Sequence, residues 1–319
     1  MKSPIRINKD IINISGATTS VRGVNRGVRK MRAVLDEFYL NSNREVRSRS
    51  YIKEGEYLSE EEAQQIYSQA RPFMEGIIEI LIAGTTENLA AKAFQEAFEE
   101  ADRLNRKLNK DLRKSEVYKI NKKGWKKPIT CDKELFDIIN SSLSFSQITD
   151  GGFDITEGTL AAVLSKEKKK SFKREDILSL LNSSTYKNII IDEGKNGGGT
   201  IFIKDKQTKL DLSLLINGYV VDKVMSVLIS NNISHALVNF SDTIRVIGNP
   251  PGNSVWRIAI SNPEDSTESM GFLKISNKAV AISGDYEKML INKRKDYSRI
   301  ADLNIQRTFD PRILEAVVV

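Results

Sequence analysis

The sequence predicts a mixed α/β protein of the α+β class, and three observations lead to this prediction. Residues 77–82 form a short apolar run, and apolar residues then recur at helical spacing through residues 90–108. Residues 210–244 indicate a strand, a tight turn at Asn217-Gly218, a helix and a second strand. Residues 255–260 alternate as a half-buried strand does.

Composition bounds the function. The 319 residues, 40% of them hydrophobic, suit one large globular domain or two ordinary ones. The net charge of +7 is compatible with phosphate-bearing ligands, and no nucleic-acid-binding motif accompanies it. The single cysteine, Cys131, excludes an internal disulfide framework, and the single histidine, His235, argues against histidine-based metal or triad chemistry.

Residues 1–71 are predicted to form a basic, helical N-terminal extension. The hydroxyl-rich string ISGATTS, residues 14–20, is typical of a helix N-cap. A second helix is predicted from Ser59 toward Arg71, with Pro72 closing it. There is no signal-peptide core and no apolar run of the roughly 20 residues that a membrane helix needs. We therefore expect no transmembrane segment and a cytoplasmic protein.

The rest of the chain, residues 72–319, is predicted to be the main domain. Thr85-Thr86 caps the long helix, and a later helix with Leu135 and Leu143 on its apolar face leads into residues 149–158. There Gly151-Gly152 lets the backbone approach a ligand, and Asp154 adds a carboxylate; a tight turn with an N-cap is the alternative. The basic run 122–127 is either a phosphate contact or a solvated loop.

The next elements are two strands, residues 189–191 and 201–203, joined by a glycine-rich hairpin. Asp211 then interrupts the apolar run that opens residues 210–244, shortly before the helix predicted within that stretch. A carboxylate at such a position is where α/β and α+β proteins usually place a polar ligand.

This central stretch resembles the signature L-D-L-G-G-I-A-K-G-Y-A-V-D of the FAD:protein FMN transferases, the ApbE family. Ser213 and Leu214 stand where the signature has two glycines, and Asn217 stands where it has a lysine. The residues in register are Asp211, Gly218, Tyr219 and Asp222.

Other segments resemble the same family in the same order. Residues 149–158, TDGGFDITEG, are similar to the family's T-G-G-A-F-D-P-T-V-G, and residues 279–287, AVAISGDYE, to A-V-A-T-S-G-D-Y-E. Residues 115–121, SEVYKIN, are similar to the segment that follows the family's long helix. The family's C-terminal metal-binding helix has no counterpart in the sequence, which is therefore expected to lack it.

The resemblance implies an α+β flavin transferase domain that moves FMN from FAD to a threonine or serine of a carrier protein and releases AMP. It implies Mg²⁺ as well, with the backbone carbonyl of Leu214 as one ligand. It places the catalytic residues at Asp285 and Tyr286. The FAD contacts would be Met74, Gly152, Phe153, Asp154, Asp211 and Asn217.

Two further expectations come from the resemblance. The string ISGATTS resembles the flavinylation motif of FMN-carrier domains, which makes Thr18 a candidate acceptor. Asp154, Asp211 and Asp285 are expected to converge on one dinucleotide cleft. The alternatives are a non-catalytic member of the family that binds flavin or serves as a structural domain, and an unrelated basic α/β binding protein.

Overall fold

The computed structural model describes residues 65–74, 76–156, 184–241, 243–251, 255–261, 269–284, 301–302, 307–308 and 315–319. The predictions on Thr18, Asp285, Tyr286 and the first 64 residues lie outside this part of the chain. The chain divides into two compact units. Unit 1 comprises Met1–Arg103, Asn217–Lys295 and Pro311–Val319, and unit 2 comprises Leu104–Ile216 and Asp296–Asp310.

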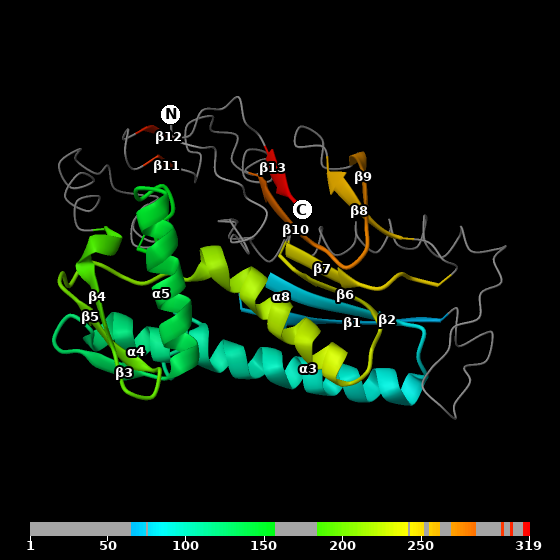
Figure 1. Ribbon diagram of the computed structural model, residues 1–319, viewed down its shortest axis with the longest axis horizontal. Helices are drawn as coiled ribbons and strands as arrows, with labels where there is room; N and C mark the ends of the chain where they lie inside the picture. Colours follow the sequence, from blue (N-terminus) through cyan, green and yellow to red (C-terminus); the bar gives the residue numbers. More distant parts are fainter. Residues whose placement is uncertain are drawn as a thin grey trace, which may run out of the picture. The chain divides into compact units, whose positions relative to one another are not determined.

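Unit 1 is built on a six-stranded antiparallel sheet (Figure 1). The strands follow the order β1-β2-β6-β7-β10-β13, and each neighbouring pair is antiparallel. Their bounds are β1 Ile66–Phe73, β2 Gly76–Ala83, β6 His235–Phe240, β7 Thr243–Ile247, β10 Ala279–Gly284 and β13 Glu315–Val318.

Two helices pack on one face of this sheet, α3 (Glu87–Leu108) and α8 (Ser213–Ser230), and both continue into unit 2. Within unit 1, the Arg71 guanidinium lies 4.0 Å from the centre of the Phe98 ring of α3. Asp222 of α8 accepts a 2.6 Å hydrogen bond from Arg245 of β7. Asp222, a residue of the central signature, therefore ties the helix to the sheet.

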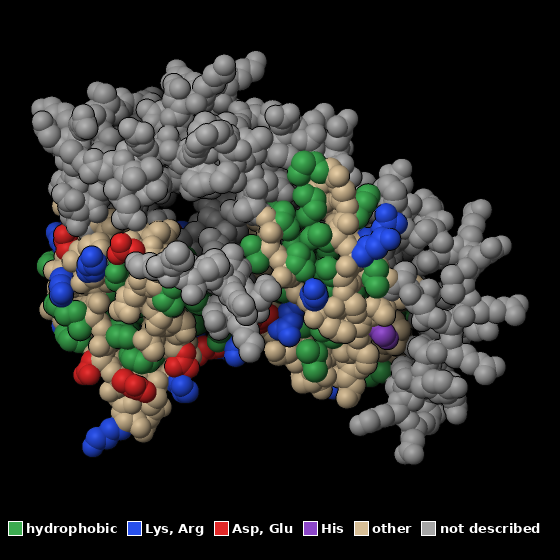
Figure 2. Space-filling view, turned by 45° about the horizontal axis from the view of Figure 1, so that its top comes forward, with side chains coloured by type: hydrophobic (Ala, Val, Ile, Leu, Met, Phe, Trp, Pro, Cys, Tyr) green, Lys and Arg blue, Asp and Glu red, His purple; other side chains and the backbone are tan. Residues whose placement is uncertain are grey.

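Charge is mixed over the described surface that Figure 2 shows, where basic and acidic side chains lie among apolar ones. This agrees with the composition, in which 49 lysines and arginines stand against 42 aspartates and glutamates. The chain as a whole carries a net charge of only +7, so a strong local excess of positive charge is a feature of particular segments.

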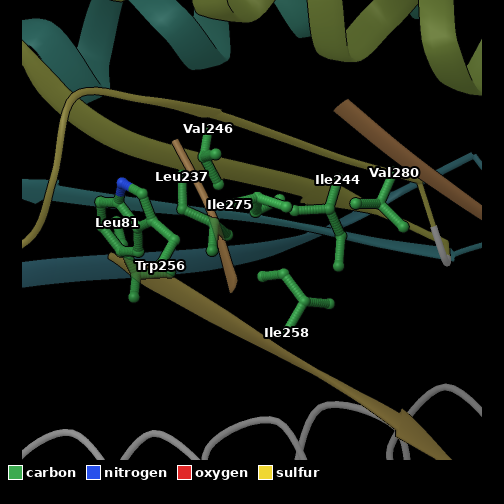
Figure 3. Packing of buried hydrophobic residues seen from close by; sticks show 8 residues of the cluster. All are labelled: Leu81, Leu237, Ile244, Val246, Trp256, Ile258, Ile275 and Val280. Atoms are coloured by element: carbon green, nitrogen blue, oxygen red, sulfur yellow. The ribbon is translucent and has the colours of Figure 1, made fainter. Parts of the chain in front are cut away.

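The opposite face of the sheet carries a core cluster shared with a hairpin of β8 (Trp256–Ser261) and β9 (Ser269–Ile275). Figure 3 shows the cluster, with Trp256 close to Leu81 and Leu237. Trp256 is fully buried, and its indole N–H donates to the carbonyl of Ile247 at 3.1 Å. That bond satisfies the one polar group of a large apolar side chain, so the full apolar area stabilises the fold.

Unit 2 packs helices α4 (Glu116–Lys123) and α5 (Lys133–Ile148) with a small antiparallel sheet of order β3-β5-β4. The strands are β3 Ile129–Cys131, β4 Ile189–Glu193 and β5 Gly199–Ile203, and a 3₁₀ turn, η2, spans Tyr186–Asn188. Two short strands, β11 (Ala301–Asp302) and β12 (Arg307–Thr308), pair with each other. The buried core includes Leu104, Leu108, Val117, Ile120, Leu135, Ile139, Ile201 and Ile203.

The expected α+β class is confirmed, together with the strand near 77–82, the long helix after Thr85-Thr86 and the hairpin of β4 and β5. The helix predicted toward Arg71 is wrong, because residues 66–73 form strand β1. Every residue of β1 pairs with β2, from Ile66 with Ala83 to Phe73 with Gly76. Pairing with a buried neighbouring strand outweighs a weak local helix preference.

The central stretch also differs from its prediction. Residues 210–212 are not a ladder strand, and α8 begins at Ser213 rather than after a turn at Asn217-Gly218. The Asp211 carboxylate accepts from the Ser213 N–H at 3.0 Å, and the Leu212 carbonyl accepts from Ile216 at 2.8 Å. These bonds start the helix early, since a side-chain acceptor and a first backbone carbonyl are already in place.

None of the helices in the described residues combines the length and the apolar character needed to cross a bilayer.

Candidate functional site

The loop that follows α5 contains two consecutive residues in the left-handed conformation, which glycine adopts most easily. Asp150 and Gly151 have φ values of 51° and 82°, in the left-handed region. The Gly151 N–H donates to Ser146 at 2.8 Å, and the Gly152 N–H donates to Thr149 at 3.0 Å. Phe153 packs edge-on against Phe145, with its ring centroid 6.1 Å away. The glycine pair therefore terminates α5 and turns the chain directly into Asp154.

Asp154 is 2% exposed, and both of its carboxylate oxygens are occupied inside the loop. Oδ1 accepts from the Thr156 N–H at 2.8 Å and from the Thr156 hydroxyl at 2.7 Å, while Oδ2 accepts from the Tyr186 N–H at 2.7 Å. Burial raises the pKa of Asp154, and these three hydrogen bonds pull the pKa back down. The carboxylate fixes the loop against the segment that leads into β4.

Asp211 has a more open environment, with a side chain 13% exposed. Its Oδ1 holds the first N–H of α8, and its Oδ2 accepts from the ammonium of Lys110 at 2.9 Å. The Lys110 side chain is 30% exposed. The Asp211 carboxylate therefore links the Lys110 ammonium to the start of α8.

The strand-like segment that carries Asp211 is held by Asn121 of α4. The Asn121 amide donates to the Leu210 carbonyl at 2.8 Å, and its oxygen accepts from the Leu210 N–H at 2.7 Å. Ser115 lies immediately before α4 and caps the helix by accepting from the Tyr118 N–H at 2.9 Å. The segment 115–121 thus contributes the N-cap of α4 through Ser115 and two hydrogen bonds to the backbone of Leu210 through Asn121.

A backbone hydrogen bond joins the two loops. The Asp211 N–H donates to the Ile155 carbonyl at 2.6 Å, so the TDGGFDITEG segment and the central signature lie side by side in unit 2. Three carboxylates were expected to converge. Two of the residues that carry them, Asp154 and Asp211, lie at or next to the two ends of this backbone hydrogen bond. The third, Asp285, lies outside the described residues.

Two other predicted residues, Met74 and Asn217, belong to unit 1. Met74 occupies the turn between β1 and β2 with a φ of 48°, an uncommon conformation for a methionine. Asn217 is buried within α8, with 8% of its surface exposed. Leu214 lies in the first turn of α8, where backbone carbonyls accept from the N–H four residues later.

Sequence reasoning did not find Lys110. It lies 101 positions from Asp211, and its neighbours Asn109 and Asp111 give no motif that marks it. Only a signal that links distant positions identifies such a pair.

Thiol and metal chemistry receive no support from the described residues. Burial raises the pKa of the Cys131 thiol to about 11, which keeps it protonated at neutral pH. Within the residues that the structure describes, no three histidine, cysteine, aspartate or glutamate side chains gather as a metal site would require.

Comparison with known proteins decides the family. A model of the ApbE family matches residues 74–319, which is well over half of the chain. The chain belongs to the ApbE family. The recognition made from the motifs is thereby confirmed.

Curated relatives carry the name FAD:protein FMN transferase. The one from Klebsiella pneumoniae (strain 342) is 24% identical over 243 residues, which cover 75% of this chain and 72% of the relative. The one from Vibrio cholerae serotype O1 is 24% identical over 227 residues, which cover 69% of this chain and 67% of the relative.

Solved ApbE structures share the fold. The ApbE protein from Thermotoga maritima aligns with a TM-score of 0.62 at 26% identity, covering 70% of this chain and 72% of that one. The flavin transferase ApbE from Vibrio cholerae aligns with a TM-score of 0.68 at 20% identity, covering 79% and 81%. These alignments confirm the expected flavin transferase fold.

Proposed function

We propose that this chain is an FAD:protein FMN transferase, which moves FMN from FAD to a threonine or serine hydroxyl of a carrier protein and releases AMP. One observation carries the proposal: two segments that match the ApbE motifs are joined by the Asp211–Ile155 hydrogen bond. Two motifs that match the family in sequence order and also lie in contact in the folded chain identify the family more specifically than either motif does by itself.

Within the proposal, the residues of unit 2 divide into two roles. Gly152, Phe153, Asp154 and Asp211 are the proposed FAD contacts, and Asp154 also holds the glycine loop in shape through its hydrogen bonds to Thr156 and Tyr186. Lys110 pairs with the Asp211 carboxylate at 2.9 Å and so holds it in place beside the start of α8.

The residues of unit 1 and those outside the described part complete the proposal from the sequence. Met74 and Asn217 are FAD contacts, Asp285 and Tyr286 are the catalytic residues, and Thr18 is a candidate acceptor. These assignments stand on the motifs alone.

The transfer step makes one bond and breaks one. The acceptor hydroxyl oxygen attacks the phosphorus of the FMN half of FAD, and the bond from that phosphorus to the bridging oxygen of the pyrophosphate breaks. The bridging oxygen departs with AMP, and the hydroxyl proton passes to a carboxylate, for which we propose Asp285. Because charge builds on the pyrophosphate oxygens, a cation near them lowers the barrier.

Magnesium is the cation that the resemblance implies. The described residues do not present its ligands, since Leu214 lies inside a helix and no acidic cluster is present among them. The assay is run both with Mg²⁺ and with a chelator, so that any dependence of the transfer on the ion is measured directly.

A second candidate function is flavin binding without transfer. The early start of α8, with Ser213 and Leu214 in its first turn, favours it, because helical backbone replaces the turn that two glycines would form. FAD titration then gives saturable binding, while no flavin becomes covalently attached.

The test uses the full chain, FAD and a carrier domain. Transfer gives a fluorescent carrier band that survives denaturing electrophoresis, together with one AMP for each flavin attached. Asp211→Asn should reduce the rate by about tenfold or more. Asp137→Asn, the same change at an exposed residue of α5, is the matched control.

Three outcomes are distinguishable. Labelling that Asp211→Asn reduces and Asp137→Asn preserves supports the transferase. Saturable FAD binding with no labelled carrier and no AMP supports the second candidate. No FAD binding at all overturns both. Loss of self-labelling in Thr18→Ala would identify Thr18 as an acceptor.

A further inference from the structure

Unit 2 carries a concentration of lysines that the proposed transfer does not use. They come from three segments, residues 122–127, 186–188 and 202–209, in which Asp205 is the only acidic residue and arginine is absent. We call them the lysine patch: Lys122, Lys123, Lys126, Lys127, Lys187, Lys204, Lys206 and Lys209.

Backbone hydrogen bonds bring the three segments together. The Ile203 N–H donates to the Gly124 carbonyl at 3.0 Å, which joins the end of β5 to the end of α4. The Lys204 N–H donates to the Asn188 carbonyl at 2.9 Å, which joins β5 to the turn before β4. The patch is thus one surface of a folded unit, although its residues span 88 positions of sequence.

Trp125 lies among these lysines and is half-buried. The ammonium groups of Lys126 and Lys206 lie 5.1 Å and 5.2 Å from the centre of its ring. Cation–π contacts hold both cations at the ring without neutralising their charge. The aromatic ring and the positive charge therefore face the same environment.

The charge of the patch is largely uncompensated. No ion pair among the described residues engages the seven exposed members, which are all of the patch except Lys209. Lys209 is half-buried, and its ammonium donates to the carbonyls of Asn121 and Lys206. Burial and then the nearby charge of Lys206 lower the pKa of Lys209, as expected where positive charges crowd together.

Apolar side chains adjoin the patch. Ile190 and Phe202 are directly paired across β4 and β5, and both project from the outer face of the small sheet. Ile190 is 43% exposed, in contrast to the buried Ile201 and Ile203 on the other face. Phe202 belongs to one patch segment and Ile190 lies two positions after another, so a surface that binds the lysines also lies near apolar groups.

We propose that the lysine patch binds the surface of an anionic lipid bilayer, a role separate from flavin transfer. Clustered lysines are attracted to anionic headgroups, and a tryptophan beside them suits the bilayer interface. Lysine carries a compact, strongly hydrated point charge, which suits diffuse attraction to a headgroup surface, whereas the planar fork of arginine suits bidentate recognition of a single phosphate.

The test follows Trp125 fluorescence during titration with unilamellar vesicles. The chain has two tryptophans, and Trp256 is fully buried, so a change in fluorescence reports Trp125. Vesicles of phosphatidylglycerol and phosphatidylcholine should shift the emission to the blue, and brominated lipid should quench it. Neutral phosphatidylcholine vesicles should do neither, and added salt should reverse the binding.

Matched variants separate the patch from overall charge. We expect vesicle binding to weaken by about 100-fold in the triple variant Lys126→Gln, Lys204→Gln and Lys206→Gln, because each lysine lost weakens binding by roughly tenfold or less. The control Lys92→Gln, Lys133→Gln and Lys195→Gln removes the same charge from exposed positions elsewhere and should change binding by about twofold or less.

Several results overturn the proposal. Equal losses in the two triple variants would show that net charge alone is responsible. Binding to neutral vesicles would exclude the electrostatic basis. Tighter binding of a single-stranded oligonucleotide than of vesicles at equal phosphate concentration would assign the patch to nucleic acid instead.

Discussion

Asp211 donates its backbone N–H to the carbonyl oxygen of Ile155 over 2.6 Å. This bond connects residues 56 positions apart and places the segment that starts α8 beside the loop that ends α5. Each loop also depends on a separate clamp, Asn121 for the first and Asp154 for the second. The stability of the candidate site can therefore be examined one clamp at a time.

Asn121→Ala removes two hydrogen bonds, both to Leu210. At about 1 kcal/mol each, their loss should lower the free energy of unfolding by about 2 kcal/mol. Urea denaturation measures the change. Asn140→Ala, at an exposed position of α5, should change stability by about 0.5 kcal/mol or less. Equal effects of the two substitutions would contradict the clamp.

Asp154→Ala leaves three donors without their acceptor, namely the buried N–H and hydroxyl of Thr156 and the partly buried N–H of Tyr186. We expect a loss of about 3 kcal/mol in the free energy of unfolding. Asp154→Asn keeps the side-chain volume but turns an amide N–H₂ toward one of these donors, so it should also destabilise. Asp137→Ala, at an exposed residue, is the control. A neutral Asp154→Ala would show that the loop does not depend on this carboxylate.

The Lys110–Asp211 ion pair should show measurable coupling. A double-mutant cycle with Lys110→Met and Asp211→Asn should give about 0.5–1 kcal/mol, since the pair is partly shielded and its atoms are 2.9 Å apart. The exposed pair Lys92–Glu96, at 3.7 Å, should give about 0.3 kcal/mol or less. If the two cycles agree, the Lys110 pair has no special role in holding the site.

Met74→Gly tests whether the left-handed turn between β1 and β2 is strained. Relief of the φ of 48° should raise the free energy of unfolding by about 1 kcal/mol. Asn232→Gly, at an exposed asparagine with φ 60°, should gain less, because asparagine tolerates this region. If Met74 contacts FAD, the same substitution weakens FAD binding while stability rises, a combination that a purely structural role does not produce.

His235 should make the fold sensitive to mild acid. Burial lowers its pKa from 6.5, and its Nδ1 accepts the Asn249 N–H at 3.0 Å, which requires the neutral ring. Because the folded pKa is depressed, the stability is present above about pH 6.5 and is lost as the pH falls through the folded pKa.

The measurement is the thermal midpoint of the protein and of His235→Asn between about pH 8 and pH 5.5. The asparagine oxygen retains an acceptor for Asn249 and does not titrate. The difference between the two pH profiles reports His235, and parallel profiles would contradict the assignment.

The sequence was sufficient where a local pattern is strong. The 22-residue helix α3 follows from its apolar spacing, and the hairpin of β4 and β5 follows from its glycine-rich turn. It failed where distant partners decide. The residues of β1 have a mixed local preference, and their strand conformation comes from pairing with β2. The start of α8 was misplaced because the Asp211 carboxylate caps the helix earlier than Asn217-Gly218 suggests.

The sequence by itself determined the family, the α+β class and the carboxylates worth following, because motif letters and periodicity are properties of neighbouring residues. The tertiary structure alone decided that Asp154 is a buried support, that Asp211 is paired with Lys110, and that lysines from three segments form one surface. These are relations between residues far apart in the chain, and only the folded backbone brings such residues within hydrogen-bond or Coulomb range.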